Sequence, residues 1–267
     1  MKYFLVLLLA GILPAVNSFA QELYVNTEPA SNMAAHSLGI RVENQGYFKP
    51  DFRSRSTLEM MYGASKNLMV HGSLYTSDLY TNNYHFEGGS VYAKYRFLSI
   101  DSVQRHFRGA AFVKAAVINN PLVNQEISLE GDNSGIQTGV VFTQLLHKLA
   151  LSGSMSYIKS VNNTANNIPT GFAHDAIAGS VSAGYLLLPK NYTSYKQVNV
   201  NLYVELLGKA NPGYGQSYVD AAPAIQFIFN SNTRLDFSYR TPLMDNMQRN
   251  TKNMYLVRLE YNLFNLF

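Results

Sequence analysis

The chain has 267 residues, of which 14% are charged and 13% aromatic, and it contains no cysteine or tryptophan. Ordinary soluble domains carry about 25% charged residues, so this chain is poor in charge without being rich in aliphatic residues. The many aromatic residues exclude an intrinsically disordered chain, and the lack of cysteine excludes disulfides, thiolate metal sites and a cysteine nucleophile. The net charge of +4 is too small to indicate a nucleic-acid partner.

The first twenty residues have the pattern of a secretory signal peptide. Lys2 precedes an apolar stretch of residues 4–16, and Ser18 and Ala20 place small side chains just before the expected cleavage site. The stretch is too short to cross a bilayer, which takes about 20 apolar residues, and no later stretch of the chain is long and apolar enough to do so. We therefore expect residues 1–20 to be a cleaved signal peptide.

From residue 36 onward the chain alternates repeatedly between apolar and polar residues. In residues 233–240, for example, Leu235, Phe237 and Tyr239 alternate with charged residues and serine. A period of two is typical of strands with one apolar face, whereas a helix needs apolar residues three and four positions apart. The segments are long, and many match the roughly 9–11 residues of a tilted strand that crosses a bilayer. We expect twelve strands, at 36–45, 55–64, 68–76, 88–99, 106–118, 133–145, 149–159, 174–188, 197–208, 218–229, 233–241 and 251–264.

The connections between these segments alternate in length. Tight turns follow the second, sixth and tenth segments, and longer polar loops, such as 160–173 and 208–217, follow odd-numbered ones. This arrangement is typical of an all-β, antiparallel, up-and-down transmembrane β-barrel with short periplasmic turns and longer extracellular loops. Closing the first strand on the last removes the sheet edges, which lipid does not tolerate. The alternative is a soluble β-sandwich or lipocalin-like barrel, for which the chain has few charges.

Aromatic residues concentrate near the ends of the expected strands. In a transmembrane barrel such residues form girdles at the two membrane interfaces. The candidates are Tyr62, Tyr75, Tyr95, Tyr157, Tyr185, Tyr239, Tyr255 and Phe264.

With these features the chain resembles bacterial outer-membrane β-barrels of the porin and transporter type, and its Tyr- and Asn-rich composition is similar to barrels of Bacteroidota. In that family, the barrel-assembly machinery reads a last strand with alternating apolar residues and a terminal aromatic residue. The resemblance implies this assembly signal for Leu259, Tyr261, Leu263 and Phe267, although Asn265 departs from the pattern. It also implies an outer-membrane location, with lipid and the assembly machinery as partners.

If the apolar face of each strand meets lipid, the opposite face lines the lumen. The charged candidates on that face are Arg41, Glu43, Glu59, Lys94, Arg96, Arg108, Lys114, Glu205, Asp220, Arg234, Asp236, Arg240, Arg258 and Glu260. Their near balance predicts ion pairs between adjacent strands, for example between residues 234–236 and 258–260. The lining indicates either a polar channel with a slight preference for anions or an ion-paired interior that only supports the barrel.

The number of strands and the start of the mature chain both affect how open the lumen is. Eight strands leave room for little more than side chains and 16–18 leave an aqueous channel, so a twelve-stranded barrel predicts a narrow pore. Residues 21–35 have no clear period. We expect them to form an N-terminal segment in the periplasm, with a plug inside the lumen as the alternative, and residues 36–267 to form the barrel.

The leading functional hypothesis is an outer-membrane channel or transporter for small hydrophilic solutes. A non-conducting barrel that binds a partner through its long loops is the first alternative. The second is a membrane hydrolase, since His85, Glu87 and Ser90 lie close together in the sequence. The six histidines lack metal-ligand spacing and the chain lacks the common nucleophile and phosphate-binding motifs. We therefore expect no metal, no cofactor and no catalytic residues.

Overall fold

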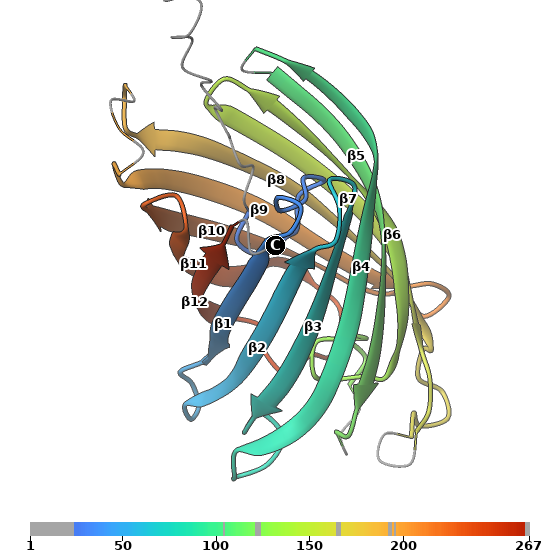
Figure 1. Ribbon diagram of the computed structural model, residues 1–267. Helices are drawn as coiled ribbons and strands as arrows, with labels where there is room; N and C mark the ends of the chain where they lie inside the picture. The colour runs from blue at the N-terminus through green and yellow to red at the C-terminus, as the bar shows by residue number, and fades with distance from the viewer. Residues whose placement is uncertain are drawn as a thin grey trace, which may run out of the picture.

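The computed structural model describes residues 24–103, 105–120, 124–163, 167–191, 194 and 196–264. In these residues, twelve antiparallel strands form one closed barrel (Figure 1), which confirms the predicted fold class. The expected signal peptide and Phe267 lie outside the described residues. The strands are β1 (Leu38–Tyr47), β2 (Arg53–Gly63), β3 (Leu68–Ser77), β4 (His85–Ser102), β5 (Arg105–Ile118), β6 (Gly135–Leu146), β7 (Leu149–Ser160), β8 (Asp175–Leu188), β9 (Asn199–Asn211), β10 (Gln216–Phe229), β11 (Thr233–Asp245) and β12 (Met254–Leu263).

The barrel closes between its first and last strands. β1 pairs with β12 over nine residues, from Leu38 opposite Leu263 to Gly46 opposite Tyr255. Every strand therefore has two hydrogen-bonded neighbours, and no sheet edge is left open. Of the residues that the structure describes, none belongs to a helix that is long and apolar enough to cross a membrane.

The alternating sequence sorts side chains between the outside and the inside of the barrel. On β9, Leu202, Val204 and Leu206 point outward and are 40–56% exposed, whereas Tyr203 and Glu205 between them are buried. The same parity in the other strands gives an apolar outer surface and a polar interior. Most of the predicted girdle aromatics are exposed or half-buried, but Tyr75 is an exception. Its side chain points inward, because it shares the parity of the polar residues on β3, and its hydroxyl lies 2.7 Å from Ser90 Oγ.

The strands extend beyond several predicted boundaries. The expected long loop 208–217 is wrong: β9 continues to Asn211 and β10 begins at Gln216, so only four residues connect them. Two of these are Gly213 and Gly215, which adopt φ values of +80° and +67°. Backbone in this left-handed region favours glycine, and here it permits a tight connection at the end of a long hairpin.

Two segments fold into the barrel. We call residues 24–35 the N-terminal segment and residues 124–134, between β5 and β6, the inward loop. The N-terminal segment, drawn in blue ahead of β1, lies within the ring of strands (Figure 1), and its Tyr24, Val25 and Ala30 are buried there. The expectation that this part of the chain lies in the periplasm is therefore wrong for residues 24–35. The physical reason is that the lumen offers hydrogen-bonding partners to its backbone, as the next section describes.

Candidate functional site

One buried carboxylate makes several hydrogen bonds to the N-terminal segment. Glu205, on β9, accepts hydrogen bonds from the backbone N–H groups of Val25 (3.0 Å) and Asn26 (2.7 Å) and from Thr27 Oγ1 (2.6 Å). The Asn26 side chain adds a further bond to the same carboxylate, at 3.1 Å. Hydrogen bonds to a charged group are stronger than those between neutral groups, so Glu205 anchors the segment on one side of the barrel.

Basic residues hold the carbonyl groups of the same segment. Lys94 Nζ, fully buried on β4, donates to the carbonyl oxygens of Pro29 (2.7 Å) and Ser31 (2.8 Å). Arg234 donates to the carbonyl oxygen of Tyr24 at 2.9 Å. The segment has no regular secondary structure, and a buried backbone group without a partner is costly. The wall of the lumen therefore supplies partners that a sheet or helix would otherwise provide.

An ion-pair network links the N-terminal segment to β1, β2 and β12. Arg41 is its centre: it lies 2.8 Å from Glu59, 2.9 Å from Glu260 and 2.9 Å from Glu28 of the N-terminal segment. Glu260 also lies 3.4 Å from Arg234 on the adjacent strand. The predicted pairing of charges between β11 and β12 is thereby confirmed.

The inward loop is attached to the wall of the lumen, across the chamber from the N-terminal segment, by apolar and charged contacts. Ile127 and Leu129 are buried in an apolar cluster with Tyr75, Ile118 and Ile158 of the strands.

Three carboxylates of the inward loop meet basic side chains of the wall. Glu126 lies 3.1 Å from Lys209, and Glu130 lies 3.1 Å from Lys114. Asp132 lies 2.6 Å from Arg55, which also binds the buried Glu87. The loop is therefore fixed at several positions around the barrel.

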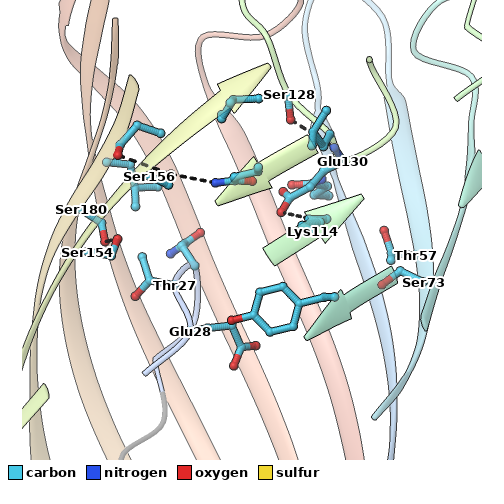
Figure 2. A pocket seen from close by; sticks show the side chains of 18 of the residues that line it. Thr27, Glu28, Thr57, Ser73, Lys114, Ser128, Glu130, Ser154, Ser156 and Ser180 are labelled. Carbon is cyan, nitrogen blue, oxygen red and sulfur yellow. Dashed lines mark hydrogen bonds and ion pairs between the residues drawn. The ribbon is translucent and has the colours of Figure 1, made fainter. Parts of the chain in front are cut away.

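A polar chamber of about 300 Å³ lies between the two segments. Asn26, Thr27 and Glu28 border it on one side and Ser128, Leu129 and Glu130 on the other. Figure 2 shows Thr27 and Glu28 facing Ser128 and Glu130 across this space. Its strand wall carries hydroxyl, amide, aromatic and charged groups, among them Ser73, Tyr92, Lys114, Gln137, Ser154, Ser156, Ser180, Lys209, Arg240 and Arg258. The chamber is large enough for a small solute, since ligand pockets begin at about 300 Å³.

The structure places the fourteen predicted lumen charges in the interior of the barrel or at its rim. Five contact the N-terminal segment: Arg41, Lys94, Arg108, Glu205 and Arg234. Two contact the inward loop: Lys114 and Arg240. Six form ion pairs within the wall: Glu43, Glu59, Asp220, Asp236, Arg258 and Glu260. Arg96 lies near a turn, where it donates to the Lys66 carbonyl.

Besides the carboxylates of the two inward-folded segments, sequence reasoning missed four charged residues of the interior. Arg55 and Lys209 share the parity of the predicted residues on their strands: Arg55 is the first residue of the predicted strand 55–64, and Lys209 stands one residue beyond the predicted strand 197–208, so the alternation could have found both. Glu87 stands just before a pair of glycines that obscures the pattern. Arg249 belongs to the connection between β11 and β12 and lies 2.7 Å from Asp220, and no local signal identifies it.

One group of side chains has the composition of a metal site. Ligand atoms of Glu28, Glu59 and His71 lie within 4.8 Å of one another. Arg41, however, already binds both carboxylates, at 2.9 and 2.8 Å. A guanidinium between the carboxylates opposes a second cation, and we assign no metal to this group.

The structure does not assemble the candidate hydrolase residues into a catalytic set. His85 Nδ1 lies 3.1 Å from Thr81 Oγ1. Glu87 instead binds Arg55, and Ser90 bonds to the hydroxyl of Tyr75. Each of the three side chains is thus engaged with a different part of the barrel.

The pKa of the Glu126 carboxyl group predicts how the inward loop responds to pH. Burial alone raises the pKa of this carboxyl, but Lys209, Arg240 and the hydrogen bond from Tyr218 outweigh burial and lower the pKa from its usual 4.5 to about 2. A lowered pKa stabilises the attached loop above pH 4.5, and this stabilisation is lost as the pH falls toward 2.

We expect the ion current through the refolded protein to increase between pH 4.5 and pH 2, in planar-bilayer recordings. A Glu126→Gln variant should already conduct more at pH 6 and should change less with acid; an equal acid response in both chains would contradict this assignment.

The barrel can be compared with known proteins. No family model and no curated protein sequence matches the chain. Among solved structures, the barrel is similar to the KdgM porin, with 11% sequence identity, a TM-score of 0.51, and 86% of this chain and 99% of that chain covered. It is also similar to an outer-membrane channel from Pseudomonas putida F1, with 10% identity, a TM-score of 0.58, and 90% and 100% of the two chains covered. At these identities the likeness shows the fold of a closed antiparallel barrel over nearly the whole chain.

Proposed function

We propose that this protein is an outer-membrane channel that passes small hydrophilic solutes through a narrow, charge-lined lumen. The observation that carries the proposal is the polar chamber of about 300 Å³ between the N-terminal segment and the inward loop. A barrel interior that served only as support could be filled with side chains, whereas this one keeps a solute-sized space lined by hydrogen-bonding groups. Residues of both segments border the chamber, which supports a narrow passage.

The outer surface and the structural likenesses support a membrane location. Val181, Val204 and Leu259 are more than half exposed on the outside of the barrel, as lipid contact requires. The two similar barrels are named a porin and an outer-membrane channel. The outward-facing Leu259 and Tyr261 of β12 are consistent with the proposed assembly signal and with the assembly machinery as a partner during biogenesis.

Planar-bilayer recording of the refolded full chain tests the channel. We expect discrete openings of low conductance, because the N-terminal segment and the inward loop both lie inside the lumen. A correctly folded barrel, verified by its β-rich circular dichroism spectrum, that produces no discrete openings at any voltage would contradict the proposal.

The occupied lumen also favours one alternative, a non-conducting barrel that binds a partner through its outer loops. Deletion of residues 160–172, which begin at the last residue of β7 and end before β8, tests it. Loss of surface or partner binding with unchanged barrel folding would favour this second function over transport.

A further inference from the structure

The two inward-folded segments and the wall they touch differ in charge. The described residues of the N-terminal segment and the inward loop contribute four carboxylates, Glu28, Glu126, Glu130 and Asp132, and no lysine or arginine. The cations that face them belong to strands all around the barrel: Arg41, Arg55, Lys94, Lys114, Lys209 and Arg240. Without the segments, these wall cations would lose carboxylate partners, so the lumen itself is more basic than it is with the segments in place.

The four carboxylates are not equally fixed. Glu126 is 16% exposed and is held by Lys209 and by the Tyr218 hydroxyl, at 2.6 Å. The side chain of Glu130, in contrast, is 62% exposed, and Lys114 is its ion-pair partner. An ion pair with one such exposed partner contributes little to stability. Glu130 can therefore leave Lys114 while Ile127 and Leu129 keep the rest of the loop packed.

Lys114 and Glu130 both border the chamber, as Figure 2 shows. Lys114 Nζ also lies 6.0 Å from the centre of the Tyr75 ring, so the ammonium group sits between a carboxylate and an aromatic face. A solute carboxylate in the chamber would meet the same ammonium group from the position that Glu130 now occupies.

We propose that Lys114 is the binding site for a carboxylate-bearing solute in the chamber, and that Glu130 is an internal competitor that occupies this site when the chamber is empty. The inference deepens the proposed channel function, because it names an anionic substrate class for the same lumen. A carboxylate tethered to the loop has an effective concentration in the millimolar range. Such a competitor neutralises the charge of Lys114 while the chamber is empty. It limits binding to solutes that are abundant or that carry more than one acidic group.

The proposal makes opposite predictions for the two members of the pair. With succinate as the probe, Glu130→Gln should lower the concentration that half-blocks the ion current, since it removes the competitor, and Lys114→Gln should raise it. We expect a shift of about tenfold for Lys114→Gln, the size expected for one charge-assisted hydrogen bond. The shift for Glu130→Gln should be smaller, up to about fivefold, because the exposed ion pair that it removes contributes at most about 1 kcal/mol. Lys159→Gln is the matched control, because Lys159 forms an ion pair of similar length, 3.2 Å to Asp175, at an exposed position that does not border the chamber. Erythritol, a neutral polyol of similar size, should not block any of the four chains.

Two outcomes would overturn the proposal. One is a shift of the succinate block in the same direction for both variants, which is what a purely structural pair would produce. The other is equal block by succinate and erythritol. Calorimetric titration of the same folded, detergent-solubilised chains with succinate separates this proposal from the channel itself. Binding that follows the predicted order in a chain without current would contradict only the channel, whereas current without succinate dependence would contradict only the anion site.

Discussion

A chain that lacks residues 21–33 is expected to conduct several times more current per channel than the full chain. The deletion removes residues 24–33 of the N-terminal segment from the lumen, together with their contacts to Glu205, Lys94 and Arg234. Conductance rises with the open cross-section, and Asn26, Thr27 and Glu28 of the segment border the chamber. Single-channel recording in planar bilayers measures the effect directly.

A point variant tests the contribution of a single anchor of the N-terminal segment to the same conductance. Glu205→Gln keeps the size of the side chain but removes the charge that accepts bonds from Val25, Asn26 and Thr27. It should give an intermediate conductance or more frequent openings. Asp175→Asn is the matched control, a carboxylate-to-amide change at an exposed position outside the lumen, and should leave the recordings unchanged. If the deletion leaves the conductance at the level of the full chain, the N-terminal segment is not the obstruction and the inward loop alone limits the current.

Replacing Arg41 with methionine is expected to destabilise the folded barrel by about 3–5 kcal/mol, the cost of removing one partner from a buried ion pair. Arg41 lies within 2.9 Å of Glu28, Glu59 and Glu260. Methionine would leave these carboxylates close to one another without the charge that separates them. Urea unfolding, followed by circular dichroism or by gel mobility of the folded form, gives the change in the free energy of unfolding.

Arg105→Met serves as the comparison for this variant, because Arg105 is exposed at the start of β5. Exposed substitutions usually change stability by about 0.5 kcal/mol or less. A second comparison, Arg41→Met combined with Glu59→Gln, should recover part of the loss, since it removes one of the stranded charges. A loss below about 1 kcal/mol for Arg41→Met alone would show that water or a rearranged lysine replaces the guanidinium, and would contradict the central role given to Arg41.

The sequence by itself determined the barrel and the orientation of its side chains. Alternation is a local property, so the residues next to a Leu or Val in the sequence are enough to predict that its side chain points outward. For the same reason the charges of Arg258 and Glu260 could be assigned to the interior, opposite Asp236 and Arg234 on β11. The exception, Tyr75, shows the limit of residue type as a guide: its parity, not its aromatic ring, decides that it points inward.

Strand ends were less predictable than strand faces. Residues 208–217 were expected to form a long polar loop, but β9 continues to Asn211 and β10 begins at Gln216. Gly208 lies in β9, whereas Gly213 and Gly215 lie in the turn. Glycine is compatible with both a turn and an extended strand. Only pairing with a neighbouring strand decides between the two, and that pairing is not visible in a short stretch of sequence.

The contents of the lumen were decided by tertiary structure alone. The backbone of Val25 meets Glu205 across 180 positions in the sequence, and the inward loop meets Lys114, Lys209 and Arg240 from separate strands. Neither segment has a periodic pattern of apolar residues, because neither forms a strand of the sheet. Their partners come together only when the barrel closes, and the segments are held by buried hydrogen bonds, ion pairs and apolar contacts that exist only in the closed barrel. Alternation therefore predicted a polar interior, whereas the two segments inside the lumen, the chamber between them and the pairing of Glu130 with Lys114 required the folded barrel.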